Sequence, residues 1–258
     1  MINQEQIIRM AKLFGNGAHV FVPKEWAGEQ ILVIKPQKKG LKERIVSELN
    51  PYLDSIVGLY LYGSYARGEQ KEDSDIDLFV ITHKKIKIKA NGFEIVCLKE
   101  NEIEKAIKIE PLLMYSLFSE AKSIINSRLL EEIKLKHKAK LKDFESFFKD
   151  TQRMIKVNED FLDSEKSEIL SSEAIVYSLV LRLRGLFIVN SILNDKKYSH
   201  KFFKLWIKSK VSNIDFSSIY SAYRSSKNDE KIKQKVRVED IKKLLEFLKN
   251  EILRLSNG

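Results

Sequence analysis

Two aspartates and a Gly-Ser pair on neighbouring apolar segments are the residues best suited to chemistry. The segment "LYLYGSYARGEQKEDSDIDLFVI" runs from Leu59 to Ile81. Gly63 and Ser64 follow one strand-like run of this segment, and Asp75 and Asp77 open the next. Residues i and i+2 of a strand point to the same face, so the two carboxylates are expected to lie side by side. Such a pair is costly unless a cation lies between its members.

These residue types suit phosphate chemistry with a hard divalent ion. Mg²⁺ prefers carboxylate oxygens and also accepts phosphate oxygens. A glycine lets the backbone come close to a ligand, and amides at the start of a helix attract phosphate, to which Ser64 adds a hydroxyl and Arg67 a charge. The P-loop pattern GxxxxGKS/T is absent. We therefore predict metal-assisted phosphoryl or nucleotidyl transfer, the alternative for a bare Asp-x-Asp being a solvated turn before a strand.

A third carboxylate is predicted to complete the site. Glu94 lies in the apolar run "FEIVCL", which is expected to lie beside "DIDLFVI". Glu94 shares one face of this strand with Val96 and Leu98, and it is the only acidic residue in the run. A buried carboxylate without a partner is expensive, which favours a ligand role. The alternative is a strand-end glutamate that faces solvent after the Asn91-Gly92 turn.

The elements that must position these residues predict an α/β domain with a mixed sheet over residues 39–128. "LKERIVSELNPYL" has helical periodicity, and "SIVGLYLY" and "IDLFVIT" are typical of buried strands. "KIKIKANGFEIVCL" alternates and turns at Asn-Gly, which predicts a hairpin. Helices are predicted in "KENEIEKAIK" and from Pro111, and "KSIIN" is a candidate edge strand.

The flanking regions have different patterns. Residues 129–258 predict an all-α bundle, with a long amphipathic segment from Ser127 towards Phe161, helices near 168–194, 200–209 and 214–225, and a last helix from about Val238. In residues 1–38, the runs "AHVFVPKEW" and "QILVIK" predict a small β-hairpin. The predicted domains are thus 1–38, 39–128 and 129–258.

Composition bounds the class of protein. The chain has 258 residues, 43% hydrophobic and 32% charged, with a net charge of +10 that favours polyanionic partners or reflects a Lys-rich solvated surface. A single cysteine, Cys97, excludes an intramolecular disulfide, and the His and Cys spacing does not suit zinc. "AIVYSLVLRLRGLFIVNSIL" carries Arg182 and Arg184, which favours a core helix over a membrane span. With no signal-peptide pattern, we expect a cytoplasmic protein.

The segment "GSYARGEQKEDSDIDLFVI" resembles the nucleotidyltransferase signature of the DNA polymerase β-like superfamily. Its spacing is that of the minimal nucleotidyltransferases, the MNT group. The resemblance implies that a nucleoside triphosphate is held by Gly63, Ser64, Arg67 and Ser74. It implies that two Mg²⁺ ions are bound, and catalysis carried, by Asp75, Asp77 and Glu94. The family more often has Asp at the third of these positions.

The resemblance implies transfer of a nucleoside monophosphate, AMP by default with ATP as substrate, to an acceptor hydroxyl. The acceptor is a protein, an RNA or a small molecule such as an aminoglycoside. The C-terminal helices resemble HEPN-like or substrate-binding helical domains, although Arg182 and Arg184 precede His200 by too many residues for a HEPN ribonuclease motif. Candidate cleft residues, with packing or surface roles as the alternative, are Arg184, Tyr198, His200, Lys201, Tyr223 and Arg224.

The N-terminal stretch suggests an alternative function. "GNGAHVFVPKEWAGEQ" resembles the swapped hairpins of AbrB-type proteins, which bind DNA as dimers. This resemblance implies DNA as a partner through the hairpin, and a homodimer. The alternative is therefore a nucleotide- or DNA-binding regulatory or antitoxin-type protein with little turnover.

Overall fold

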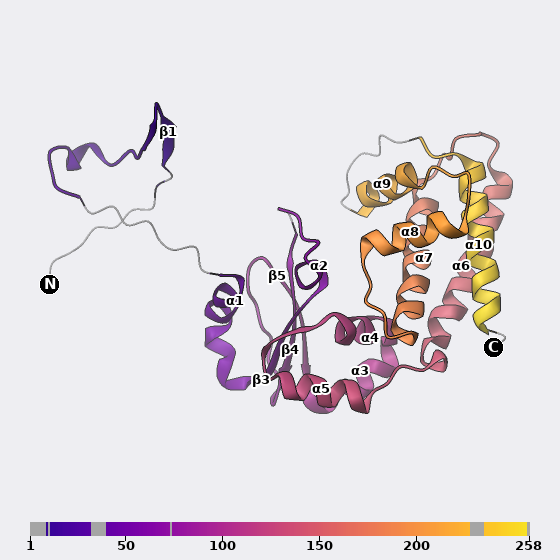
Figure 1. Cartoon of the computed structure of the whole chain (residues 1–258), viewed down its shortest axis with the longest axis horizontal. Helices are drawn as coiled ribbons and strands as arrows, with labels where there is room; N and C mark the ends of the chain where they lie inside the picture. Colours follow the sequence, from indigo (N-terminus) through magenta and orange to yellow (C-terminus); the bar gives the residue numbers. More distant parts are fainter. Residues whose placement is uncertain (1–8, 10, 32–39, 73, 228–234, 257–258) are drawn as a thin grey trace. The chain divides into compact units, whose positions relative to one another are not determined.

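The computed structural model describes residues 9, 11–31, 40–72, 74–227 and 235–256 (Figure 1). The chain divides into two compact units, Met1–Leu41 and Lys42–Gly258. The second unit holds the sheet and the helices that follow it, and no further division separates them.

The first unit contains the expected hairpin, formed by an earlier stretch than predicted. β1 (Lys12–Phe14) pairs antiparallel with β2 (Gly17–His19), and Gly15 takes a positive φ of 54° in the turn. Most of "AHVFVPKEW" is not strand, because Pro23 lacks an amide donor and starts the 3-10 turn η1 (Lys24–Trp26). Residues 32–35 of "QILVIK" lie outside the described residues.

The second unit is built on a four-stranded mixed sheet with the order β5-β4-β3-β6. β3 (Ile56–Tyr62) pairs antiparallel with β4 (Ile76–Thr82) on one side and with the edge strand β6 (Lys122–Ile125) on the other. β4 also pairs in parallel with β5 (Phe93–Lys99). The predicted α/β class, the mixed sheet and the edge strand are confirmed.

The hairpin predicted in "KIKIKANGFEIVCL" is wrong. Residues 83–92 contain no strand and connect β4 to β5, which runs parallel to it. Ile86 and Ile88 are half-buried between exposed lysines. The alternation therefore reflects an extended connection that packs against the protein with one side and faces solvent with the other. A parallel neighbour needs a longer connection than a tight turn provides.

The two faces of the sheet pack against different helices. The ring centroids of Tyr60 and Phe79 lie 5.8 Å apart, and those of Phe79 and Phe118 lie 6.0 Å apart. Phe118 belongs to α4 (Pro111–Glu120). On the opposite face, the guanidinium of Arg44 lies 5.3 Å from the ring centroid of Phe93, which brings α1 (Leu41–Leu49) to that side. The helices around the sheet are α1 (Leu41–Leu49), η2 (Asn50–Ser55), α2 (Gly63–Arg67), η3 (Glu100–Glu102), α3 (Ile103–Ile109) and α4 (Pro111–Glu120).

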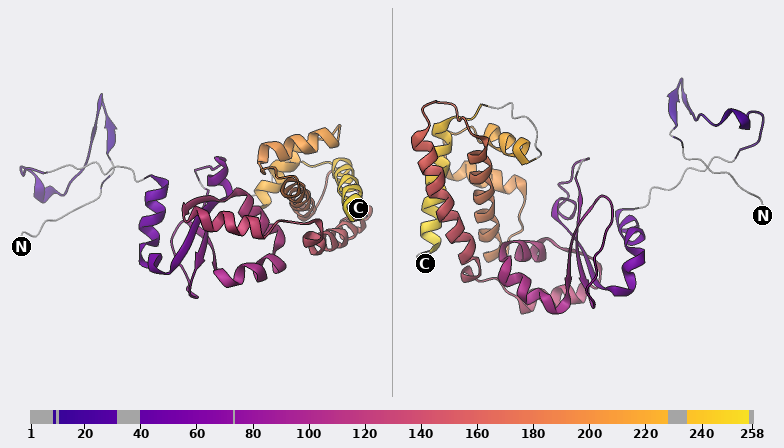
Figure 2. Two further views of the ribbon diagram at one scale, coloured as in Figure 1. Left: turned by 60° about the horizontal axis from the view of Figure 1, so that its bottom comes forward. Right: turned by 180° about the vertical axis from the view of Figure 1, so that it is seen from behind.

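The C-terminal part is helical, as predicted, with one break. The amphipathic segment from Ser127 divides at His137, and Asp143 starts the next segment by accepting the Lys140 amide at 2.9 Å. The helices are α5 (Ser127–Lys136), η4 (Leu141–Phe144), α6 (Glu145–Ser164), α7 (Glu173–Leu193), α8 (His200–Lys210), α9 (Phe216–Lys227) and α10 (Val238–Ser256). Figure 2 shows α6, α7 and α10 side by side.

Helix α7 is the centre of this helical part. Leu179, Val180, Leu183, Leu186 and Val189 are fully buried, and they belong to one hydrophobic cluster with the sheet residues that face α4. Among the described residues, α7 alone is long and apolar enough to cross a membrane by length and composition, and 56% of its most apolar window is buried inside the protein. This burial is that of a core helix.

Candidate active site

The turn between β3 and α2 lies directly against Asp77. Gly63 takes a positive φ of 69°, which favours glycine. A Cβ atom added at Gly63 would lie 1.9 Å from Oδ2 of Asp77 and 2.6 Å from its Cγ. The backbone and the carboxylate therefore touch, which brings the Gly-Ser turn and the Asp-x-Asp motif into one site.

Tyr62, Asp77 and Glu94 form a row across three strands. Tyr62 lies opposite Asp77 in the antiparallel register, and Asp77 lies beside Glu94 in the parallel register. Residues in register point to the same face of a sheet, so the two carboxylates are neighbours. Burial raises the pKa of the Tyr62 hydroxyl, and the charges of Asp77 and Glu94 raise it further.

Asp77 is a half-buried carboxylate in a repulsive field. Burial raises its pKa above the ordinary value, and the charges of Glu94 and, more weakly, Asp75 raise it further. The Ser64 amide opposes this shift by donating a hydrogen bond to the Asp77 carboxylate, and Arg67 opposes it by its charge. A cation beside Asp77 and Glu94 would relieve this repulsion, so the chemistry of the donor set fits a divalent metal ion.

The structure brings Asp77 and Glu94 together but leaves Asp75 and Glu94 exposed. The burial argument for Glu94 therefore does not apply, and its position beside Asp77 is what supports a ligand role. Among the described residues, no three His, Cys, Asp or Glu side chains converge as a ready-made metal cage. Asp75, Asp77 and Glu94 as metal ligands and catalytic residues stay predictions.

Arg67 is held between two carboxylates. Its Nε lies 2.8 Å from Oε2 of Glu69, and its guanidinium also pairs closely with Glu120 of α4. The Glu120 side chain is only 5% exposed; burial raises its pKa, whereas Arg67 and the Gly63 amide lower it. These contacts fix α2 against α4, and the predicted contact of Arg67 with nucleotide stays a prediction.

Ser74 shapes the approach to Asp75. Its Oγ accepts the Lys71 amide at 2.8 Å, and its own amide donates to the Lys71 carbonyl at 3.2 Å. These two bonds close the turn just before β4. The predicted role of Ser74 in binding nucleotide is not tested by them.

A second polar cluster comes from the helical part and meets the first at Glu69. The His200 amide donates to Oε1 of Glu69 at 3.0 Å. Nδ1 of His200 lies 3.0 Å from the hydroxyls of both Tyr198 and Tyr220, and Nε of Arg184 donates to the Tyr198 hydroxyl at 2.8 Å. Three of the predicted cleft residues, Arg184, Tyr198 and His200, are thus brought together.

The imidazole of His200 is neutral at pH 7 in this cluster. Burial, and then the positive charge of Arg184, lower its pKa to about 4, against the opposing charge of Glu69. Tyr198 lies between two cations, because the guanidinium groups of Arg67 and Arg184 each lie 5.2 Å from its ring centre. Of the other predicted cleft residues, Tyr223 hydrogen-bonds Arg184, and Lys201 is exposed.

Three residues of the site were not predicted. Tyr62 could have been found, because it ends the strand before Gly63 and shares its face with Tyr60. Glu120 also left a signal, since it is the one acidic residue in the apolar helix "PLLMYSLFSE". Glu69 left none, because its partner His200 is 131 positions away.

Residues 41–177 match the family described as "Nucleotidyltransferase domain". Comparison with curated proteins finds no match. Two solved structures are similar to the chain at 14% identity. The spectinomycin adenyltransferase AAD(9) from Enterococcus faecialis, with ATP and spectinomycin, is matched over 81% of this chain and 97% of its own, with a TM-score of 0.43.

The second similar structure is a nucleotidyltransferase-like protein from Exiguobacterium sibiricum 255-15. It is matched over 83% of this chain and 75% of its own, with a TM-score of 0.36. The family match covers more than half of the chain and includes Gly63, Asp77, Glu94 and Glu120. This chain therefore belongs to the nucleotidyltransferase domain family and is an enzyme of that class.

Proposed function

We propose that the chain transfers a nucleoside monophosphate, AMP by default, from a nucleoside triphosphate to an acceptor hydroxyl in the presence of Mg²⁺. The observation that carries the proposal is the direct contact between the Gly63 turn and Asp77, with Glu94 on the neighbouring strand. A phosphate-approaching backbone and a pair of repelling carboxylates are the two halves that such chemistry needs.

The roles follow from the chemistry of each group. We assign the phosphates of the nucleotide to Gly63 and Ser64, and the divalent ions to Asp75, Asp77 and Glu94. Mg²⁺, when bound, neutralises phosphate charge and makes the acceptor hydroxyl easier to ionise. We assign the proton of that hydroxyl to Glu94, whose carboxylate is exposed and hence open to an acceptor.

The test is incubation with α-labelled ATP, CTP, GTP or UTP, Mg²⁺ and a cell extract. Wild-type protein should label one class of molecule, and Asp77→Asn should label none. The control is Asp163→Asn, which changes an exposed aspartate on α6 and should leave labelling unchanged. Full labelling by both Asp75→Asn and Asp77→Asn would contradict the assignment of the site.

Asp77→Asn should also keep or raise the melting temperature. A raised carboxyl pKa means that ionised Asp77 opposes folding, and its cost is present at neutral pH and disappears as the pH falls. Asparagine removes the charge and can still accept the Ser64 amide. Loss of labelling together with a lower melting temperature would instead point to damaged folding.

A second candidate function rests on the N-terminal unit. Leu13 and Phe14 of the hairpin are 91% and 73% exposed, and Phe21 is exposed as well. Apolar surface of this kind is typical of a covered interface. We propose, with the AbrB-type resemblance, that the hairpin pairs with a second copy and binds DNA.

The minimal-nucleotidyltransferase subtype and the HEPN-like character of residues 129–258 stay predictions.

Sedimentation of the full chain tests this candidate. Wild-type protein should be a dimer, and Leu13→Ser with Phe14→Ser should be a monomer with unchanged nucleotide labelling. A wild-type monomer, or a dimer that survives both substitutions, would contradict it.

A further inference from the structure

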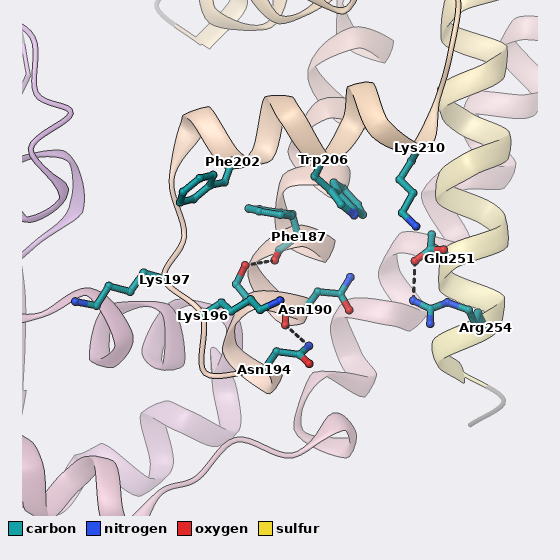
Figure 3. A pocket seen from close by; sticks show the side chains of 11 residues that line it. Phe187, Asn190, Asn194, Lys196, Lys197, Phe202, Trp206, Lys210, Glu251 and Arg254 are labelled. Carbon is teal, nitrogen blue, oxygen red and sulfur yellow. Dashed lines mark hydrogen bonds and ion pairs between the residues drawn. The ribbon is translucent and has the colours of Figure 1, made fainter.

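A cavity of about 610 Å³ lies among α7, α8 and α10, in the helical part of the chain (Figure 3). Neither the transfer chemistry nor the family match assigns it a role. Three aromatic rings line it, Phe187 from α7 and Phe202 and Trp206 from α8. Figure 3 shows these rings along the α8 side, with Asn190, Asn194 and Lys196 facing them.

The rings form a platform that is partly open to solvent. The centroids of Phe187 and Trp206 lie 5.2 Å apart, which fixes the indole against the inner ring. Phe202 is 58% exposed, and its helix neighbour Leu205 is exposed as well. Aromatic side chains that are partly open to solvent stack readily on the faces of nucleic-acid bases, whatever the base sequence.

The platform is surrounded by positive charge. Six lysines and no Asp or Glu occur between Lys196 and Lys210. Lys196, Lys197 and Lys210 line the cavity, and in the described part of the chain no carboxylate forms an ion pair with any of them. Among the described residues that line the cavity, Glu251 is the one acidic residue, and it is paired with Arg254 at 2.8 Å. The lysines of the cavity should therefore attract an anion, and its aromatic rings should favour an anion that carries an aromatic group.

The spread of the charges favours a strand over a single nucleotide. Lys196 and Lys197 precede α8, whereas Lys210 ends it, and a helix of this length spans about 16 Å. The amides of Asn190 and Asn194 offer both donors and acceptors, which base edges can use and lipid chains cannot. We propose that this cavity binds a single-stranded segment of nucleic acid, with bases on the rings and phosphates on the lysines.

The site has a direct connection to the carboxylate cluster. α8 begins at His200, whose amide is bonded to Glu69 of the segment that follows α2. A strand on α8 could therefore present its 3′ hydroxyl as the acceptor, an assignment that rests on the proposed function. The 3′ oxygen would then bond to the α-phosphorus as the bond to pyrophosphate breaks, and its proton would pass to Glu94.

Tryptophan fluorescence provides a local readout. The chain has two tryptophans, so Trp26→Phe leaves Trp206 as the sole reporter. Titration of the full chain with a 12-nucleotide single-stranded RNA should quench this signal to saturation. The same sequence as DNA distinguishes the two sugars, and saturable quenching by either one supports the proposal. The proposal would be overturned if neither single strand quenched the fluorescence while ATP, a double-stranded RNA or anionic lipid vesicles did.

Two kinds of variant separate stacking from charge. Phe202→Ala should weaken binding roughly 5- to 100-fold with little change in salt dependence. Each of Lys196→Ala, Lys197→Ala and Lys210→Ala should reduce the salt slope by about 0.7. Lys166→Ala, an exposed lysine outside the cavity, is the matched control. Lysine variants with the wild-type salt slope would contradict the proposal.

Labelling with α-labelled nucleotides separates the two claims. Label on the bound strand supports its role as acceptor. A strand that binds but stays unlabelled overturns that role while supporting the binding site. If the same protein then labels another molecule of a cell extract, the proposed transfer activity holds with a different acceptor.

Discussion

Replacing Gly63 by alanine should damage the site at its most crowded point. The new methyl carbon would lie 1.9 Å from Oδ2 of Asp77, whereas an ordinary contact begins at 3.4 Å. The carboxylate or the turn must therefore move by about 1.5 Å. A shift of about 1 Å in reacting groups can cost roughly 100-fold in rate, so we expect a loss of at least that size in nucleotide transfer.

The same substitution also has a cost in stability. A residue with a Cβ in the left-handed region costs about 1 kcal/mol relative to glycine. Displacing a packed carboxylate adds a further cost of about 1–2 kcal/mol. The free energy of unfolding should therefore fall by about 2–3 kcal/mol.

Gly68→Ala is the matched control, since Gly68 also has a positive φ, of 73°, but nothing lies within 4 Å of the Cβ position. It carries the backbone cost without the overlap. Urea unfolding and labelling of the same cell extract should be measured for both variants. Gly68→Ala should lose about 1 kcal/mol and keep most of its labelling. Equal labelling by the two variants would refute the argument that the Gly63 turn and Asp77 act as one site.

Two further predictions concern the contacts around the site. Arg67→Met leaves Glu120 buried without its partner, so it should lower the free energy of unfolding by about 3 kcal/mol, and adding Glu120→Gln should restore most of the loss in urea unfolding. Between pH 6.5 and about 4, the imidazole of His200 is protonated in the unfolded chain but still neutral in the folded chain, because its folded-state pKa is lowered. The free energy of unfolding therefore falls as the pH falls through this window. Since His200 is partly exposed, the loss between pH 7 and pH 5 should be on the order of 1 kcal/mol, and His200→Gln should abolish this difference.

Much of the sheet could be predicted because its signals are local. The apolar runs that contain Tyr60 and Phe79 bound their strands closely. Asp75 lies just before β4, outside its register, so the common face predicted for Asp75 and Asp77 stays a prediction. Alternation in "KIKIK" was misleading, because a period of two describes any extended segment with one side on the protein. The partner of β5 depends on which edge of β4 is free to form hydrogen bonds, and no local sequence pattern predicts that.

The contacts between the sheet part and the helices could not be predicted. Glu69 and His200 meet through a bond between a side chain and a backbone amide, which leaves no trace in residue spacing. The same holds for Arg184 of α7 and Tyr198 of the segment before α8, because packing of the buried face of α7 sets the direction of Arg184. Such pairs depend on tertiary packing, whereas sequence periodicity reports only the burial of each element by itself.

The shared hydrophobic cluster of the sheet and the helices has a consequence for how the protein opens. Phe79 and Leu183 belong to one continuous cluster, so neither part can lose its structure without exposing apolar surface of the other. Amide protons in β4 and in α7 should thus exchange with solvent through the same rare global opening, with equal free energies. A fragment ending near residue 128 would lack most of this cluster. Exchanging the helical part for that of a relative would require refitting the face of the sheet.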